Sequence, residues 1–342
     1  MVIVGDAPQI PAQDQQKLNN EIERLYSKLR KLGWTREVCE QLAPFTLRIN
    51  TLKEEKGIKI LAHSYQSPEI IFGIADIVGD SLGLAKKATV IEEDTIMFCG
   101  VDFMAETVKI LNPEKTVYVP QKGRDCTLAD SITGKDVRKL KEQYPGVPVV
   151  CYVNTTADVK AESDICCTSA NAKKIIETLE EDTIIYLPDH NMGVNLAKIT
   201  GKKIITWDKG FCRTHHAFTE RRLDKIFKDP DVKTFAHLEC RPEIVDRVDF
   251  AGGTGDMHRY ARESENGHKI LFLTEQGFID RMKVEYPHLN FQDSHMICVS
   301  MKRNDLYTTL KAMENPTSKH LIELDEEIRL KAYKAVNNML KY

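Results

Sequence analysis

The chain has 342 residues, of which 42% are hydrophobic and 29% are charged, as in an ordinary globular protein. Its formal net charge of −3 and its pI near 6.4 argue against a nucleic-acid or membrane partner. No apolar run approaches the roughly 18 residues that a membrane span needs. The start, Met1-Val-Ile-Val-Gly5-Asp6, is too short an apolar stretch for a secretory signal, so we expect a cytoplasmic protein.

In chain order, the sequence opens with a charged amphipathic helix, expected over residues 14–32, and then repeats one pattern three times. Each block has a β-type run that ends in polar residues and a short strand that ends in a hydroxyl residue and enters a helix. A third strand, a helix and a fourth strand follow, and then a cysteine. We expect first strands at 59–65, 149–154 and 234–239, and second strands at 76–81, 164–169 and 249–254. Third strands are expected at 95–99, 183–187 and 269–273, and fourth strands at 116–119, 203–206 and 289–291. The tail has helix-like segments at 305–312 and 325–340.

This order of elements predicts the fold class. Short apolar runs with β-branched residues, separated by segments of helical length, indicate parallel βαβ units with helices on both faces of each sheet. We therefore predict an α/β protein of three pseudo-three-fold-related α/β/α sandwich domains, with the active site at their central interface. The predicted domains are an N-terminal helical extension (1–45), a first repeat (46–125) with the tail (299–342) packed on it, a second repeat (126–212) and a third repeat (213–298).

The nine cysteines include three that follow the fourth strands. Cys126, Cys212 and Cys298 are separated by two equal intervals of 86 residues. An odd cysteine count without a signal peptide argues against a disulfide framework and leaves buried thiols or metal ligands. Because no C-x-x-C pair occurs, a zinc ribbon, a ferredoxin-type cluster and a thioredoxin motif are all disfavoured. Any metal site must therefore be assembled from distant segments.

Polar residues at the strand ends predict where that site lies, because ligands of open parallel sheets bind beyond the carboxyl ends of the strands. Three pairs end the first strands: His63 and Tyr65, Tyr152 and Asn154, and His237 and Glu239. Ser81, Ser169 and Thr254 end the second strands, where helices begin. These hydroxyls are either N-caps or part of an anion site, since helix N-termini bind phosphate and carboxylate. If the domains face one another, all these residues converge on one cavity.

Three thiolates around such an axis favour a [4Fe–4S] cluster. Three corners of the cube take cysteines, and the fourth iron stays open as a Lewis acid. Zinc with three sulfurs usually takes a fourth protein ligand. Buried core thiols are the alternative; that interpretation suits Cys99, Cys151 and Cys166 in apolar strands better than the three cysteines in polar loops.

Proton transfer falls to His63, His237 and Glu239, each of which can titrate near neutral pH when partly desolvated. A satisfied core histidine is the alternative for His63. His215 and His216 closely follow Cys212 and could line the same cavity.

Several motifs together resemble the quinolinate synthase family, from about residue 58 to about residue 312. They are Ala62-His-Ser-Tyr-Gln-Ser-Pro-Glu69, Gly79-Asp-Ser-Leu82, Gly100-Val-Asp-Phe-Met-Ala-Glu-Thr107, Ile110-Leu-Asn-Pro113, Tyr152-Val-Asn154, Cys167-Thr-Ser-Ala-Asn-Ala172 and Pro188-Asp189. The resemblance implies a [4Fe–4S] enzyme of NAD biosynthesis that condenses iminoaspartate with dihydroxyacetone phosphate to quinolinate, with loss of phosphate and water. Iminoaspartate would be supplied by an aspartate-oxidising enzyme.

The resemblance also implies site residues. The cluster ligands of the family fall on Cys126, Cys212 and Cys298. Its substrate-contacting positions fall on His63, Ser81, Tyr152, Val153, Asn154, Ser169, His215, His237, Leu238, Glu239 and Thr254. Glu239 is implied as general base, with His237, Tyr65 and His63 as the other catalytic residues.

The sequence departs from the usual family pattern in three segments. Leu238 stands where proline is usual, Gly253 where serine is usual, and Cys126-Thr-Leu-Ala129 where Cys-Pro-Met-Ala is usual. Two other functions therefore stay open, namely a paralogous iron–sulfur hydro-lyase for another small polycarboxylate and a non-catalytic cluster-based sensor. A sensor normally needs an output module, and the sequence shows no DNA-binding motif.

Overall fold

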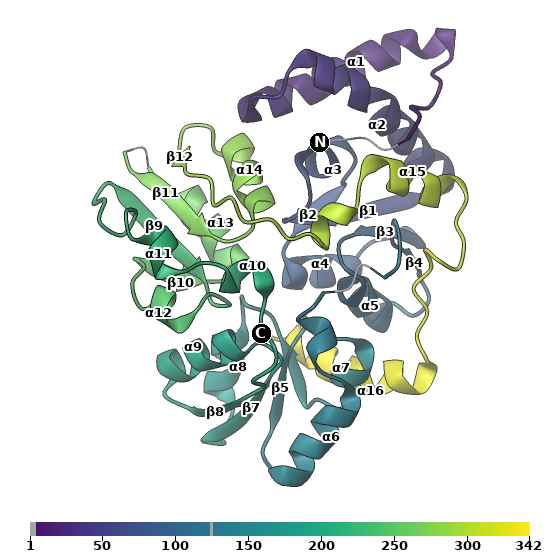
Figure 1. Ribbon diagram of the computed structural model, residues 1–342. Coiled ribbons are helices and arrows are strands. Elements are labelled where there is room, and N and C mark those ends of the chain that lie inside the picture. Colours follow the sequence, from purple (N-terminus) through teal and green to yellow (C-terminus); the bar gives the residue numbers. More distant parts are fainter. Residues whose placement is uncertain (1–4, 124–125, 266) are drawn as a thin grey trace.

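The computed structural model describes residues 5–123, 126–265 and 267–342. It contains three parallel four-stranded sheets with helices on their faces, and the sheets surround a common centre (Figure 1). The strand orders are β2-β1-β3-β4, β6-β5-β7-β8 and β10-β9-β11-β12, which is one topology used three times. The predicted α/β fold class is thus confirmed. The exact domain boundaries stay a prediction.

The N-terminal extension consists of two long helices. Its elements are η1 (Ala12–Asp14), α1 (Gln15–Leu29), η2 (Arg30–Leu32) and α2 (Arg36–Lys56). The Thr35 side chain accepts the Val38 N–H at the start of α2, and Gly57, with φ of 60°, ends the helix in the left-handed conformation that favours glycine. Leu25 and Leu29 of α1 pack with Leu42 of α2 in a core shared with the first sheet. The extension is therefore part of the folded body.

The bounds of the repeats are as follows. The first repeat has β1 (Ile58–His63), α3 (Pro68–Gly73), β2 (Ile77–Gly79), α4 (Ser81–Ala88), β3 (Thr95–Cys99), α5 (Asp102–Leu111) and β4 (Thr116–Tyr118). The second has η3 (Ala129–Ser131), α6 (Gly134–Gln143), β5 (Val149–Tyr152), α7 (Ala157–Ala161), β6 (Ile165–Cys167), α8 (Ala172–Thr178), β7 (Thr183–Leu187), α9 (His190–Thr200) and β8 (Lys203–Thr206). The third has α10 (Arg213–His216), α11 (Glu220–Leu223), β9 (Val232–His237), α12 (Pro242–Val245), β10 (Phe250–Gly252), α13 (Thr254–Glu263), β11 (Lys269–Leu273), α14 (Gln276–Glu285) and β12 (Asn290–Phe291). The tail has η4 (Met301–Arg303), α15 (Leu306–Glu314) and α16 (Glu326–Met339).

One aspartate at the same place in each repeat helps to fix the register. Asp76, Asp164 and Asp249 precede the second strands, and each carboxylate accepts a backbone N–H near the start of the first strand, at 2.8, 2.8 and 2.9 Å. The strands pair so that His63 lies beside Gly79, Tyr152 beside Cys167 and His237 beside Gly252. Because the pairing is parallel and in equivalent register, the carboxyl ends of the strands lie at one edge of each sheet.

The C-terminal tail divides between two repeats. We expected all of it to pack on the first repeat, and α15 does so, with Leu306 and Leu310 in the core of α1, α2 and the first sheet. In contrast, α16 lies against α7, β6 and α5 and buries Ala332, Val336 and Met339 in the core of the second repeat. The short helix α7, of five residues, therefore shares its face of the second sheet with α16. In the part of the chain that the structure describes, no helix is long and apolar enough to cross a membrane.

Truncation of Met339 tests the role of α16. The side chain is fully buried in the core of the second repeat, so Met339→Ala should lower the free energy of unfolding by about 2–5 kcal/mol. Leu330 lies on the same helix but is 57% exposed, so Leu330→Ala should change it by less than about 0.5 kcal/mol. Urea denaturation of both variants would measure this, and equal effects would contradict the packing described.

Candidate active site

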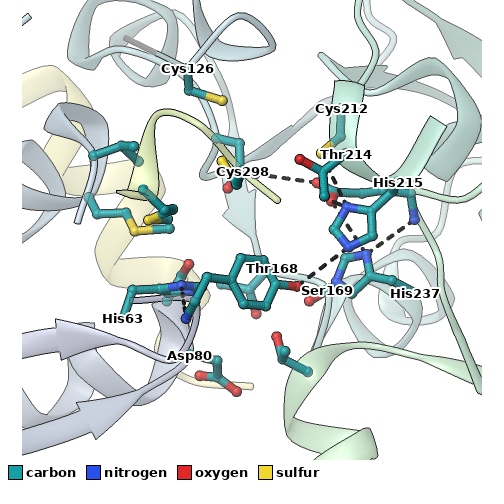
Figure 2. A pocket seen from close by; sticks show the side chains of 18 of the residues that line it. His63, Asp80, Cys126, Thr168, Ser169, Cys212, Thr214, His215, His237 and Cys298 are labelled. Carbon is teal, nitrogen blue, oxygen red and sulfur yellow. Dashed lines mark hydrogen bonds and ion pairs between the residues drawn. The ribbon is translucent and has the colours of Figure 1, made fainter. Parts of the chain in front are cut away.

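The carboxyl ends of the three sheets face one cavity with about 630 Å³ of empty volume (Figure 2). Every repeat contributes side chains to its wall. Of the residues that the sequence singled out, those that line the cavity are His63, Tyr65, Ser81, Cys126, Tyr152, Asn154, Ser169, Cys212, His215, His237, Glu239, Thr254 and Cys298. The convergence that the repeat predicted is therefore present, although the catalytic and binding roles remain predictions.

Three singled-out residues do not line this cavity. Val153 is buried beside it, with its backbone N–H donated to Cys167, and Leu238 packs into the core of the second repeat. The His216 side chain bonds to Asn191, with 3.0 Å between Nδ1 and Nδ2. The side chains of Val153 and Leu238 therefore support the site by packing, and any contact with a ligand would have to come from their backbones.

Two of the histidines are buried at matching positions, as the last residues of β1 and β9. His63 Nδ1 accepts the N–H of Tyr65 at 3.2 Å, and His237 Nδ1 accepts the N–H of Glu239 at 3.3 Å. Burial and the positive charge of Arg281 lower the pKa of His63 to about 3. Burial and the neighbouring His215 lower the pKa of His237 to about 3. Both imidazoles are thus neutral near pH 7, and each has Nε2 available to carry its proton.

Glu239 lies at the centre of the polar side of the cavity. Its Oε2 is 2.5 Å from His215 Nδ1 and 3.4 Å from His237 Nδ1, and its Oε1 accepts from Asn154 Nδ2 at 3.3 Å. Burial opposes ionisation of this carboxyl, but the two imidazoles outweigh it, so that its pKa is lowered. Glu239 is therefore a buried carboxylate with hydrogen-bond donors on both oxygens.

A hydrogen-bonded chain of four residues leads from Tyr65 to Glu239. Tyr65 Oη is 2.7 Å from Thr274 Oγ1, which in turn is 3.0 Å from His215 Nε2. With His215 Nδ1–H donated to Glu239, Nε2 accepts from Thr274, whose oxygen accepts from the phenol. Burial raises the pKa of Tyr65 well above its usual value, so the phenol keeps its proton. The chain connects an acid to a base across two repeats.

Thr274, which bonds to Tyr65 and His215, was not predicted. Nor were the lining residues Asp80, Thr168 and Thr214, or the apolar wall of Val101, Phe103, Met104 and Met301. Thr274 directly follows β11, so the rule that strand ends face the ligand would have found it. The apolar wall comes mostly from the start of α5 and from η4, where nothing in the hydrophobic pattern separates a cavity wall from a core.

The hydroxyl residues at the second strands are not the N-caps considered above. Asp80 caps α4 through its bond to the Gly83 N–H, Asn171 is the N-cap of α8, and Gly253 is the N-cap of α13. Asp80 takes the role because it precedes Ser81 and its carboxylate reaches the free N–H groups of the first turn. Ser81, Ser169 and Thr254 all line the cavity, so their hydroxyls are available to a ligand.

The three cysteines come from three separate loops and line the same cavity. Burial raises the pKa of Cys126 to about 12, that of Cys212 well above its usual value, and that of Cys298 as well. Negative charge on Cys298 would further oppose ionisation of Cys126, and negative charge on Cys126 would oppose that of Cys212. Three thiolates here therefore need a compensating cation, and the donor set fits an iron–sulfur cluster. Among the described lining residues there is no fourth cysteine, so the set leaves one corner without a cysteine ligand.

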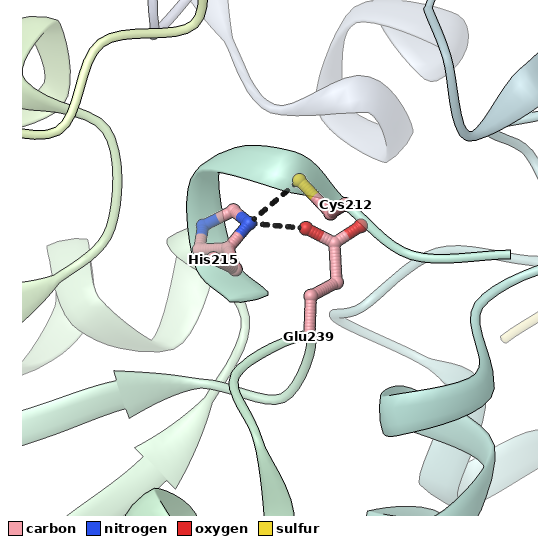
Figure 3. A group of neighbouring side chains, drawn as sticks. All are labelled: Cys212, His215 and Glu239. Atoms are coloured by element: carbon pink, nitrogen blue, oxygen red, sulfur yellow. Dashed lines mark hydrogen bonds and ion pairs between the residues drawn. The ribbon is translucent and has the colours of Figure 1, made fainter. Parts of the chain in front are cut away.

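Cys212 also belongs to a second donor group (Figure 3). Its Sγ is 3.1 Å from His215 Nδ1, and one ligand atom from each of Cys212, His215 and Glu239 lies within 4.8 Å of the others. Sulfur, nitrogen and oxygen donors in this arrangement could hold a single divalent ion such as Zn²⁺. His215 Nδ1 would then have to leave its contact with Glu239.

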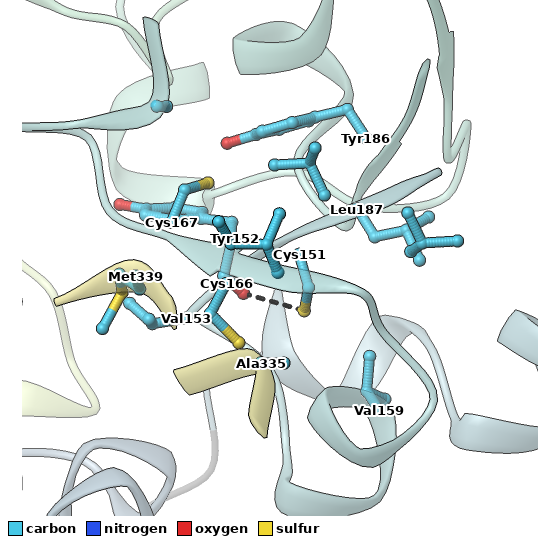
Figure 4. Close-up of a cluster of buried hydrophobic side chains, with 14 of the residues drawn as sticks. Cys151, Tyr152, Val153, Val159, Cys166, Cys167, Tyr186, Leu187, Ala335 and Met339 are labelled. Atoms are coloured by element: carbon cyan, nitrogen blue, oxygen red, sulfur yellow. Dashed lines mark hydrogen bonds between the residues drawn. The ribbon is translucent and has the colours of Figure 1, made fainter. Parts of the chain in front are cut away.

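Cys99, Cys151 and Cys166 are buried core thiols, as their place in apolar strands indicated. Figure 4 shows Cys151 and Cys166 between β5, β6 and α16, where Ala335 and Met339 pack. The sulfurs of Cys151 and Cys166 lie in the core of the second repeat and do not line the cavity.

The fold and the site define a class of protein, namely a three-repeat α/β enzyme whose central cavity is lined by a buried hydrogen-bonded chain and three cysteines at the repeat interface. Comparison with known proteins agrees: the profile of the family described as "Quinolinate synthetase A protein" matches residues 47–341. The chain belongs to this family.

Individual relatives support the assignment. The chain is 44% identical over 299 residues to a quinolinate synthase of Sinorhizobium fredii, an alignment that covers 86% of this chain and 82% of the relative. It is 46% identical over 290 residues to quinolinate synthase 2 of Mesorhizobium japonicum, covering 84% and 88%. It is 44% identical over 297 residues to a quinolinate synthase of Alkaliphilus metalliredigens, covering 86% and 96%.

Replacement of His63 tests its neutral, buried state. The folded protein keeps this imidazole neutral down to about pH 3, whereas the unfolded chain takes up a proton near pH 6.5. The contribution of His63 to stability is therefore full above pH 6.5 and is lost as the pH falls. From pH 7 to pH 5, the cluster-free protein should lose about 2 kcal/mol more stability than His63→Gln.

The control is His268→Gln, because His268 is exposed and should leave the pH dependence unchanged. Urea midpoints at pH 7, 6 and 5 would provide the comparison. Parallel curves for the wild type and His63→Gln would show that the fold does not lower the pKa of His63.

Proposed function

We propose that this chain is a quinolinate synthase that condenses iminoaspartate with dihydroxyacetone phosphate and uses a [4Fe–4S] cluster held by Cys126, Cys212 and Cys298. One observation carries the proposal: one cysteine from each of three distant loops lines a single buried cavity, next to the His215–Glu239 pair. Membership of the quinolinate synthetase A family supports the same conclusion. When bound, such a cluster supplies an iron without a cysteine ligand, which is a Lewis acid.

The proposed substrates are both anionic, and the cavity offers donors for anions. Ser81 and Thr254 begin α4 and α13 and line the cavity, and Asn154 and Ser169 add further polar groups. We assign these residues to the carboxylates and the phosphate. Tyr152 ends β5 beside Asn154, and burial raises the pKa of Tyr152 well above its usual value. The phenol therefore keeps its proton and can donate a hydrogen bond to an anionic substrate.

Proton transfer is assigned to the chain between Tyr65 and Glu239. Glu239, held ionised by His215, is the general base. The phenol of Tyr65 is the acid, and Thr274 connects it to His215. His63 and His237, both neutral, can donate from Nε2 to a developing oxyanion. Loss of water and phosphate during ring closure needs both an acid and a base, and the cavity has both.

The proposal includes a setting for the enzyme. We place it in the cytoplasm, where it would receive iminoaspartate from an aspartate-oxidising enzyme. The buried cavity suits this reactant, because an imine is hydrolysed by water and the apolar wall of Phe103 and Met104 limits water on one side.

The test is an anaerobic assay of the purified protein with iminoaspartate and dihydroxyacetone phosphate. Formation of quinolinate and free phosphate in equal amounts is the expected result. An iron–sulfur hydro-lyase for another polycarboxylate would form no pyridine dicarboxylate, and a cluster-based sensor would bind iron without any turnover. Either outcome would refute the proposal.

Serine replacements test the ligand set. Cys126→Ser, Cys212→Ser and Cys298→Ser should each abolish normal cluster assembly, because a hydroxyl is a poor substitute for a thiolate on iron. Cys99→Ser and Cys166→Ser, which change core thiols, should retain the cluster. Anaerobic iron and sulfide analysis with electron paramagnetic resonance would measure this. A full cluster in any of the first three variants would remove that cysteine from the set.

Thr274 tests the hydrogen-bonded chain. Thr274→Val keeps the shape of the side chain but removes the oxygen between Tyr65 and His215, so kcat should fall about a hundredfold, the lower end of what a positioned proton-transfer group contributes. Thr274→Ser retains a hydroxyl and should recover most of the rate. The cluster content should be unchanged in both. Wild-type turnover in Thr274→Val would show that the chain does not carry protons.

A further inference from the structure

Three acidic residues occupy corresponding places in the three repeats. Asp102, Asp189 and Glu275 each follow a third strand, namely β3, β7 and β11. Each lies at the start of the next helix, α5, α9 or α14. Asp189 and Glu275 are fully buried. A buried carboxylate is costly unless several donors satisfy it, so its partners indicate its purpose.

Each of these carboxylates binds the backbone of a cysteine loop. Asp189 Oδ2 accepts the N–H of Cys212 at 3.0 Å, and Glu275 Oε1 accepts the N–H of Cys298 at 3.2 Å. Both bonds span 23 residues of sequence. In the first repeat, Asp102 Oδ2 accepts the N–H of Gly123 at 2.8 Å, three residues before Cys126. The same contact thus recurs in all three repeats.

Helix capping alone does not explain this arrangement, because a cap needs only one carboxylate oxygen. Asp305 caps α15 through Oδ1, and Asp325 caps α16 through Oδ1. Asp189 uses Oδ1 for the Met192 N–H and Glu275 uses Oε2 for the Gly277 N–H, while the other oxygen of each reaches the cysteine loop. One carboxylate therefore connects the helix after the third strand to the loop after the fourth.

The packing around these contacts is tight. A Cβ at Gly210, two residues before Cys212, would lie 1.9 Å from the carbonyl oxygen of Pro188, beside Asp189. A Cβ at Gly277 would lie 2.7 Å from the carbonyl oxygen of Gln66. Glycine is therefore required at position 210, in the Cys212 loop, and at position 277, in α14, where each lies close to the backbone of another segment.

Lys302 extends the contact in the third repeat. Its Nζ lies 3.0 Å from Glu275 Oε1 and donates to the carbonyl oxygen of Tyr65 at 2.5 Å. The Cys298 loop is thereby connected to the backbone of the proposed acid Tyr65 in the first repeat. The ion pair also compensates the buried charge of Glu275.

We propose that Asp189 and Glu275, with Asp102 as the third member, are positioning residues that hold the three cysteine loops so that the sulfurs meet in the cavity before a metal binds. The inference rests on the proposed function for the identity of the metal, but the contacts themselves belong to the metal-free chain. The loops are preorganised, and cluster assembly does not have to order them.

Amide replacements separate positioning from capping. In Asp189→Asn the side-chain oxygen can still cap α9, but the NH₂ group then faces the N–H of Cys212, so two donors meet. Glu275→Gln likewise places an NH₂ group against the N–H of Cys298. In the full-length cluster-free protein, alkylation by iodoacetamide should become about three- to tenfold faster at Cys212 in Asp189→Asn only, and at Cys298 in Glu275→Gln only. Mass spectrometry of tryptic peptides would give the rate at each cysteine.

Asp325→Asn is the matched control, since it changes a cap that holds no cysteine loop, and its three rates should equal those of the wild type. A general loss of structure would instead raise all three rates together and lower the unfolding midpoint. Asp189→Ser, whose shorter side chain can cap α9 without reaching Cys212, provides a second variant should Asp189→Asn fail to fold. Wild-type alkylation at Cys212 and Cys298 in the amide variants would overturn the proposal.

The reconstituted protein gives an independent readout. Iron should be lost to a chelator several-fold faster from Asp189→Asn and Glu275→Gln than from Asp325→Asn. If the wild type binds iron–sulfur cluster but forms no quinolinate, the proposed function fails while the positioning role stands. If the wild type makes quinolinate and neither amide variant changes alkylation or iron loss, the positioning role fails alone.

Discussion

Burying three cysteine thiols and a carboxylate together is the constraint on which the rest of this structure depends. Each of these groups is disfavoured as an anion in a water-poor cavity, and burial raises the pKa of all three thiols. Such groups persist only where donors and cations compensate them. The fold supplies donors at strand ends, at helix starts and on the buried imidazole of His215 beside Glu239. It also places these groups at an interface between three repeats, and the three repeats together enclose a cavity that a single sheet could not enclose.

The repeat is what makes this enclosure possible. One parallel sheet has its carboxyl ends along one edge, open to water on the far side. Three such edges turned toward each other give a cavity whose wall is made of equivalent positions. Equivalent positions need not carry the same residue: the first strands end in His63, Tyr152 and His237. The symmetry thus provides the positions, and different residues at these positions give the cavity phenol, carboxylate, imidazole and hydroxyl groups.

The sequence predicted most of the fold because its signals are local. The third strands were predicted to the residue, since buried parallel strands are short apolar runs with clear ends. The first strands were predicted to end two residues too late, because Tyr65, Asn154 and Glu239 lie in the turns after them. The equal spacing of the cysteines predicted that they converge. Capping was misjudged at Ser81, where the preceding Asp80 was the stronger cap.

What the sequence could not predict depends on contacts between distant segments. Nothing in the apolar stripe of α16 specifies which sheet it covers, and Thr274 is one threonine among many until β1 and α10 are placed beside it. The roles of Asp189 and Glu275 likewise appear only when the second carboxylate oxygen is seen to reach another loop. Periodicity identifies elements, whereas the partner of an amphipathic face is decided by the whole fold.

The position of α16 has a consequence for how the chain folds as it is synthesised. Its buried face, with Ala332, Ala335, Val336 and Met339, completes the core around β5 and β6, yet the ribosome makes it long after those strands. Until then, an apolar face of the second sheet remains uncovered, and with it Asn171, whose amide donates to the carbonyl oxygen of Met339. The core of the second repeat therefore cannot be completed until α16 has been synthesised. During that time the exposed apolar surface is a binding site for chaperones that shield such surfaces.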